Sequence, residues 1–176
     1  MDHKNPKRRE RKMKKSISIV LSIVLIACFT SFAVAVTQAE KDEIVTVVNK
    51  TAAMLEKEGK AGLDKIQSIR FGDNNYVYVG DMTCTIIAHG WQPHLIGKSI
   101  MGIQDDTGFK FMAKLMEGVK GSTATKNGKT YYNGATWVKY RWPAPDDKTK
   151  FKNKIVYAKG CLMGDENVFV TAGMYE

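Results

Sequence analysis

Two short apolar runs near the middle of the chain, Tyr76–Val79 and Thr85–Ala88, predict a pair of strands. Both consist mainly of aromatic and β-branched residues, and a Gly-Asp-Met-Thr turn at 80–83 separates them, which is the pattern of an antiparallel hairpin. Because both runs are apolar on both faces, we expect the hairpin to lie inside a sheet rather than at its edge.

Amphipathic helices are expected on either side of this hairpin in the sequence. Residues 40–70 carry apolar side chains at three- and four-residue spacing, and Gly59 and Gly62 predict a break before a short second helix. In residues 109–120 the apolar stripe is Met112, Leu115, Met116 and Val119. We expect these faces to pack on the sheet. The sequence leaves open whether part of the first face also pairs with a second copy of the chain.

Three further strands are expected in the C-terminal part, at Trp137–Pro143, Lys154–Cys161 and Val168–Tyr175. The first alternates, so Tyr140 and Trp142 share the inward face with Val138, while Arg141 faces away from them. Residues 121–129 are polar and rich in turn formers, and we expect a loop there. The order helix, two strands, helix, three strands predicts an α+β fold with an antiparallel sheet.

Residues 1–39 are expected to form a leader. A basic segment precedes the apolar stretch 16–36, and small residues follow at Ala33-Val34-Ala35 and Thr37-Gln38-Ala39, which is the pattern of a secretory signal peptide. Two alternatives stay open: an uncleaved membrane anchor through residues 16–36, and a lipoprotein lipidated on Cys28. In each case residues 40–176 form one periplasmic or otherwise extracytoplasmic domain.

The net charge of +9 comes mostly from this leader. The chain has 27 basic and 18 acidic residues, of which residues 1–39 hold 8 and 2, which leaves 19 and 16 in residues 40–176. Such a balanced body has no electrostatic footprint for phosphates, so we expect no nucleic-acid partner. His89 and His94 are isolated and no Cys-x-x-Cys occurs, so we expect neither a metal site nor another cofactor.

Several short motifs follow one another along residues 40–176. They are Tyr76-Val77-Tyr78-Val79, Ala88-His89 with Pro93, Leu95-Ile96-Gly97-Lys98, Asp106-x-Gly108, Trp137-Val138-x-Tyr140-x-Trp142-Pro143, Lys154-x-x-Tyr157 and Ala172-Gly173-Met174-Tyr175. In this order, behind a secretory leader, they resemble the single Cache domain of bacterial extracytoplasmic sensors. Because the sequence stops at Glu176, directly after the last expected strand, the resemblance is to the stand-alone secreted members.

The resemblance implies a PAS-like, five-stranded antiparallel sheet in the order 2-1-5-4-3, with the long N-terminal helix on one face. It also implies a pocket on the other face for a small organic acid, amino acid or amine. The Gly90-Trp91 insertion before Pro93 departs from many relatives and leaves the shape of that loop open.

Six residues are candidates for ligand contacts on these grounds: His89, Trp91, Tyr140, Trp142, Lys154 and Tyr157. His89 can donate to a carboxylate, and Trp91 can close the pocket as a lid. Tyr140 and Trp142 can form an aromatic wall, and Lys154 with Tyr157 can hold a carboxylate. The structural alternatives are core packing for the aromatic residues and His89, and a solvated side chain for Lys154.

Cys84 and Cys161 are expected to form a disulfide. In the implied strand order, the first hairpin turn and the turn between the fourth and fifth strands lie at the same end of the sheet. Cys84 follows one turn and Cys161 precedes the other, and a cysteine pair outside the cytoplasm favours a bond. Two free thiols are the alternative.

The function expected from the sequence is an extracytoplasmic, small-molecule-binding sensory module of the kind used in signal transduction and chemotaxis. The ligand is expected to be a small carboxylate or other small organic metabolite. An alternative is a module that docks on a membrane receptor or kinase, and a homodimer through the first helix is compatible with both. A small secreted enzyme is a remote alternative, because Cys84 and His89, five residues apart on one strand, would point to opposite faces.

Overall fold

The computed structural model describes residues 35–176. The expected signal peptide, membrane anchor and lipidated Cys28 lie outside the described residues, apart from the last few residues of the leader. Among the helices of this described part, none is long and apolar enough to span a membrane.

The first helix, α2, runs from Gln38 to Glu58. It begins with a capping box, in which the Thr37 side chain accepts the Glu40 backbone N–H and the Glu40 carboxylate accepts the Thr37 N–H. Its buried face is Ile44, Val48, Thr51, Ala52 and Leu55. The helix ends at Gly59, whose φ of 62° is available to glycine at little cost. A 3₁₀ helix, η1 (Gly59–Ser68), follows and confirms the predicted break.

The central sheet contains β1 (Arg70–Phe71), β2 (Asn75–Asp81), β3 (Ile86–His89), β6 (Ala135–Pro143), β7 (Phe151–Met163) and β8 (Glu166–Tyr175). All of its pairings are antiparallel, and β2, β8, β7 and β6 are neighbours in that order, with β3 and β1 both paired to β2. The five strands predicted from the sequence therefore have the expected order, β3-β2-β8-β7-β6. The short strand β1 was not predicted.

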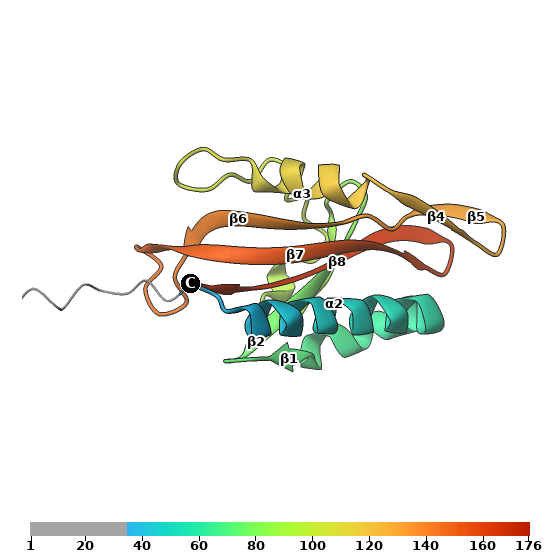
Figure 1. Cartoon of the computed structure of the whole chain (residues 1–176), viewed down its shortest axis with the longest axis horizontal. Coiled ribbons are helices and arrows are strands. Elements are labelled where there is room, and N and C mark those ends of the chain that lie inside the picture. Colours follow the sequence, from blue (N-terminus) through green and yellow to red (C-terminus); the bar gives the residue numbers. More distant parts are fainter. Residues whose placement is uncertain (1–34) are drawn as a thin grey trace, which may run out of the picture. The chain divides into compact units, whose positions relative to one another are not determined.

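The sheet separates two hydrophobic clusters, with α2 on one face and α3 (Phe111–Val119) on the other (Figure 1). Along β8, Val168, Val170 and Ala172 belong to the α2 cluster, whereas Phe169 belongs to the α3 cluster. This alternation follows from the two-residue period of a strand. The α+β architecture with a long helix on one face is confirmed.

A β-bulge interrupts the pairing of β2 with β3. Val79 pairs with Ala88, but Gly80 pairs with Ile86, so Ile87 is the additional residue. As a consequence, Ile86 and His89 contribute to the same side of the sheet although they are three residues apart. A regular strand would have placed these two side chains on opposite faces.

The segment that was expected to be a loop forms a second, two-stranded sheet. Its strands are β4 (Thr123–Lys126) and β5 (Lys129–Tyr132). Asn127 and Gly128 connect them with φ values of 52° and 76°, which suits the Asn-Gly turn of a tight hairpin. The loop prediction for residues 121–129 was wrong because both strands are exposed and have mostly polar side chains. Without a run of apolar residues on each side, the Asn-Gly turn did not indicate a hairpin.

The expected Cys84–Cys161 disulfide is also wrong, because both thiols are free and buried in this structure. Cys84 belongs to the cluster on the α3 side, and Cys161 to the cluster on the α2 side. The topology correctly placed the two residues at one end of the sheet, but it did not say which face each side chain takes. Burial raises the pKa of Cys84 to about 11 and that of Cys161 to about 12.

We predict that neither thiol is oxidised in the intact chain. Alkylation of the denatured, unreduced protein followed by peptide mapping should label both Cys84 and Cys161. Reducing agent should leave the melting temperature unchanged, because no cross-link constrains the unfolded state. A mapped Cys84–Cys161 peptide, or a melting temperature that falls on reduction, would contradict the free-thiol structure.

Candidate functional site

A cavity of about 50 Å³ lies on the α3 side of the sheet, and we call it the sheet-face cavity. The sheet strands contribute aromatic and polar side chains to its lining: Tyr76, Tyr78, His89, Tyr140, Trp142 and Lys154. The rest of the lining is mostly aliphatic: Ile86, Gln92, Leu95, Ile100, Ile103 and Phe111. The site therefore has a polar part and an apolar part, as small-molecule sites commonly do.

Lys154 supplies the positive charge of the cavity. Its side chain is only 5% exposed, and its ammonium donates to the Tyr76 hydroxyl at 3.3 Å. The same ammonium lies 4.9 Å from the ring centroids of both Tyr76 and Tyr175. Among residues 35–176, the ion pairs do not include Lys154. A buried cation without an acidic partner is costly, so this position is suited to an anionic ligand.

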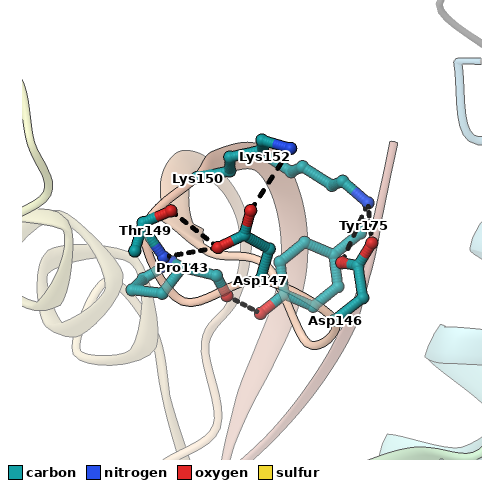
Figure 2. A network of polar contacts seen from close by, with 7 residues as sticks. All are labelled: Pro143, Asp146, Asp147, Thr149, Lys150, Lys152 and Tyr175. Atoms are coloured by element: carbon teal, nitrogen blue, oxygen red, sulfur yellow. Dashed lines mark hydrogen bonds and ion pairs between the residues drawn. The ribbon is translucent and has the colours of Figure 1, made fainter.

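Tyr175 is the second aromatic neighbour of this ammonium, and Figure 2 shows how its hydroxyl is held. The hydroxyl donates to the carbonyl of Pro143 at 2.8 Å, which ties the end of β8 to the end of β6. Within the following loop, Asp147 accepts from the Thr149 hydroxyl at 2.6 Å. The Tyr175 ring, one of the two aromatic neighbours of Lys154, is thus held by a hydrogen bond to the backbone.

His89 is presented to the cavity in one tautomer. Its Nδ1 accepts two backbone N–H groups, from Trp91 at 3.1 Å and from Gln92 at 2.9 Å. A nitrogen that accepts hydrogen bonds carries no proton, so the neutral ring has its proton on Nε2. Burial, the charge of Lys154 and then His94 lower the pKa of His89 to about 4. At neutral pH the ring is therefore an uncharged donor through Nε2–H.

Tyr140 and Trp142 form an aromatic wall together with Phe111. The Phe111 and Tyr140 rings stack with centroids 3.9 Å apart, and Trp142 meets both edge to face, at 5.5 Å and 5.9 Å. Burial raises the pKa of Tyr140 well above its ordinary value, so its hydroxyl stays protonated and can donate. Both predicted residues line the cavity, and they pack in the core as well.

Trp91 lies beside the cavity rather than in its lining. Its side chain is 53% exposed, and its ring stacks on Tyr76 with centroids 6.5 Å apart. The Arg70 guanidinium lies 6.0 Å from the Trp91 ring centroid and donates to the Gly90 carbonyl at 2.7 Å. Trp91 therefore covers the outer side of the tyrosine that contacts Lys154.

Tyr157 is not brought together with the other candidates. It packs against the cluster on the α2 side, and its ring centroid is 5.0 Å from that of Trp137. Lys154 and Tyr157 are three residues apart on the regular strand β7, so they point to opposite faces. Of the six predicted contacts, four line the cavity, Trp91 lies beside it and Tyr157 lies on the other face of the sheet.

The prediction missed Tyr76 and Tyr78, which line the cavity from β2. Both rings pack on His89, with centroid distances of 5.0 Å and 5.3 Å. Their signal was present, because Tyr76 and Tyr78 alternate with Val77 and Val79 and must share one face. The aliphatic residues of the connecting segment carried no comparable signal, since their loop has no regular period.

The expectation that Cys84 and His89 point to opposite faces of one strand does not hold, because Cys84 lies in the turn before β3 with a φ of 64° and the bulge at Ile87 shifts the alternation within the strand. The two groups are nevertheless engaged separately. The Cys84 thiol contacts the Met101 sulfur at 3.9 Å, whereas His89 Nδ1 accepts the loop N–H groups. With the pKa of Cys84 raised to about 11, the thiol is protonated at neutral pH and is a poor nucleophile.

An antiparallel sheet with a long helix on one face and a small, partly aromatic cavity on the other is the arrangement of a small-molecule-binding domain. The chain matches the model of the family Single Cache domain 2 over residues 6–176. It therefore belongs to the single Cache domains, which are extracytoplasmic sensors that bind small molecules and occur in chemoreceptors and kinases.

Solved structures agree with this assignment at the level of the fold. One is a Cache chemosensory domain described for its carboxylic acid recognition, with 24% identity, a TM-score of 0.61, and coverage of 78% of this chain and 94% of that one. A second is the periplasmic sensor domain of a chemotaxis protein, with 20% identity, a TM-score of 0.63, and coverage of 80% and 99%.

A third is a methyl-accepting chemotaxis protein from Vibrio parahaemolyticus RIMD 2210633, with 18% identity, a TM-score of 0.57, and coverage of 78% and 88%. No curated protein matches this chain significantly.

Proposed function

We propose that this chain senses a small monocarboxylate, which it binds in the sheet-face cavity. The observation that carries the proposal is the ammonium of Lys154, which is buried and has no ion-pair partner among residues 35–176. A carboxylate would supply the missing charge in a desolvated setting, where charge-assisted hydrogen bonds are strong. The recognition of carboxylic acids described for one of the structural neighbours supports the same ligand class.

The neutral donors around Lys154 fit the same ligand. The Tyr76 hydroxyl accepts from Lys154 and keeps its own proton available, and His89 offers Nε2–H because its Nδ1 is occupied. The lining contains no acidic side chain, so an ammonium group of an amino acid or amine would be buried without a partner. The selectivity proposed here is therefore for acids that carry no positive charge.

The size of the cavity limits the ligand further. A volume of about 50 Å³ is that of a few water molecules, since one buried water needs at least about 10–15 Å³ on the same measure. The aliphatic part of the lining suits a short hydrocarbon end. We therefore expect acids of two to three carbons, roughly, to be preferred over longer ones unless the loop moves.

The experiment is a thermal-shift and calorimetric screen at pH 7 with acetate, propionate and pyruvate. Matched probes are propionamide, which lacks the charge, and propylammonium, which reverses it. A carboxylate at 100 times its Kd should stabilise the protein by about 2.7 kcal/mol, while the amide and the amine should give no shift. Stabilisation by the amine, or by none of the carboxylates, would sink the proposal.

The cellular location, the signalling partner and the oligomeric state are further parts of the proposed function. The pattern of residues 1–39 supports export by a signal peptide, and we propose a periplasmic location with a membrane receptor or kinase as the signalling partner. A homodimer through α2 stays a prediction. The outward face of the helix includes Asp42, Thr46, Lys50 and Lys57, all exposed, so such an interface would be largely polar.

A further inference from the structure

The segment from Gly90 to Leu95 covers part of the sheet-face cavity, because it contributes Gln92 and Leu95 to the lining. Its first residue is anchored twice: the Gly90 N–H donates to the Val77 carbonyl at 2.9 Å, and Arg70 donates to the Gly90 carbonyl at 2.7 Å. Beyond Gly90, the next two backbone N–H groups both point at His89 Nδ1. Gly97 and Lys98 pair with Ile86 at the other end of the segment, so between these anchors His89 Nδ1 is the acceptor that ties Trp91 and Gln92 to the sheet.

These two hydrogen bonds require an unprotonated Nδ1. In the imidazolium form both ring nitrogens are donors, so an Nδ1–H would face the N–H groups of Trp91 and Gln92. Protonation would then remove two acceptor contacts and leave two backbone donors unsatisfied. A flip of the ring does not solve this conflict, because the imidazolium has a donor at either nitrogen.

Burial and the charges of its neighbours oppose the protonation of His89. Lys154 faces it from β7, His94 from the short 3₁₀ helix η2 (Pro93–Leu95), and the Tyr76 and Tyr78 rings pack on it from β2. Arg70 lies on the far side of Gly90 and adds a further positive charge to this corner. The cavity lining contains no carboxylate that would stabilise an imidazolium.

We propose that His89 is a proton-sensitive latch: its neutral form holds residues 91–95 over the cavity, and its protonation releases this segment from the anchored Gly90 onward and lowers the affinity for ligand. The latch goes beyond ligand sensing, because it makes the domain respond to acid as well as to its ligand. The expected loss of ligand affinity rests on the proposed function, whereas the expected release of the segment does not.

The pH at which the latch opens is set by the surroundings of His89, whose pKa is lowered to about 4. The segment on the other side of the cavity should stay in place at this pH. There the Asp105 carboxylate accepts the Thr107 hydroxyl and the backbone N–H groups of Arg141, Phe109 and Thr107, and these bonds hold its pKa down at about 2. Acid near pH 4 should therefore release the segment held by His89 and leave the segment held by Asp105 in place.

The first test needs no ligand. Nuclear magnetic resonance would follow the His89 ring nitrogens and the backbone amides of Trp91 and Gln92 from pH 7 to pH 3.5. We expect both amides to shift and to lose exchange protection with the midpoint of His89, while the Arg141 amide stays protected. Amides that stay unchanged while His89 gains its proton would overturn the latch.

The matched variant is His89→Asn, because the Asn side-chain oxygen can accept the same two N–H groups and does not titrate. In H89N the Trp91 and Gln92 amides should show no titration over this range. His94→Asn is the control, since it replaces the other histidine of this corner and leaves the Nδ1 acceptor of His89 in place, and it should keep the latch. Titration of the loop amides in H89N with the wild-type midpoint would assign the transition to another group.

The second test measures the affinity for pyruvate at pH 7 and pH 4, because this acid stays largely ionised over the range. Affinity should fall at least about tenfold in the wild type, which corresponds to about 1.4 kcal/mol, and clearly less in H89N. An equal fall in both proteins would overturn the coupling. If pyruvate did not bind at pH 7 but the Trp91 and Gln92 amides still titrated with His89, only the proposed effect on ligand affinity would be overturned.

Discussion

Lys154→Met is expected to lower the affinity for the bound carboxylate by about 100-fold or more. Removing one partner of a buried, hydrogen-bonded charge pair costs about 2–5 kcal/mol, and a tenfold change in Kd corresponds to about 1.4 kcal/mol. Calorimetry at pH 7 with the carboxylate found in the screen would measure the loss. Methionine has a similar length and is apolar, so the space beside Tyr76 and Tyr175 stays filled.

The same substitution should not destabilise the unliganded protein. Lys154 is 5% exposed, and within residues 35–176 its ammonium contacts a hydroxyl and two aromatic rings but no carboxylate, so its charge is poorly compensated without ligand. Replacing it by an apolar side chain of similar volume is expected to be neutral or stabilising. Affinity and stability would then change in opposite directions, which a merely structural lysine would not show.

Lys152→Met is the matched control for this experiment. Lys152 precedes Lys154 by two residues on β7, but it is exposed and pairs with Asp146 at 3.2 Å (Figure 2). Exposed ion pairs contribute little, so we expect carboxylate affinity within about twofold of the wild type. If K152M weakened binding as much as K154M, the effect would be one of general charge rather than of the buried ammonium.

The arrangement of the sheet could be predicted because its signals are local and repeated. Each of the five main strands is marked by its own run of β-branched, aromatic or alternating residues, and the order of motifs matched one family throughout. The order β3-β2-β8-β7-β6 then followed from the resemblance. The hairpin of β4 and β5 was missed because it packs little, so its Asn127-Gly128 turn was the main signal it carried.

The site could be predicted only in part, since it depends on which face each side chain takes. Strict alternation along β7 separates Lys154 from Tyr157, and applying it would have excluded Tyr157. On β3, strict alternation would instead have been misleading, because the bulge at Ile87 places His89 on the same face as Ile86. A bulge inserts one residue without a clear sequence signal. The facing of His89 relative to the residues before the bulge could therefore not be predicted from one sequence.

Burial of Lys154 was also beyond the sequence. A lysine near the start of a strand is usually solvated, and here it is enclosed because Tyr76 and Tyr175 come from β2 and β8. That enclosure is a property of three strands together. The disulfide prediction failed for a related reason, since strand order fixes the end of the sheet where a residue lies but not its face.

Phe169→Ala is expected to have the largest effect on stability, about 3–5 kcal/mol of unfolding free energy. The Phe169 side chain is fully buried and meets the Tyr78 ring edge to face at 6.2 Å. Its loss would leave a void under a wall of the cavity. Urea unfolding of the full chain would measure the change, with the slope expected to stay constant if unfolding remains two-state.

Gly80 provides a sharper test of the same contact, because it lies on β2 directly against this ring. A Cβ added at Gly80 would be 2.6 Å from Phe169 Cζ and 3.2 Å from the Thr85 carbonyl oxygen. Gly80→Ala should therefore overpack the wild-type core and cost about 1–3 kcal/mol. In the Phe169→Ala background the ring is absent, and the added methyl group should be nearly neutral or stabilising because it fills part of the void.

The double-mutant cycle measures this coupling directly. We expect an interaction free energy of about 1–3 kcal/mol that makes the double mutant more stable than the sum of the single changes predicts. Additive effects would mean that the Gly80 backbone can move away from Phe169 without cost. Because Tyr78 packs on both Phe169 and His89, such freedom would also loosen the strand from which the cavity takes its tyrosines, so the cycle tests how rigidly the fold holds the site.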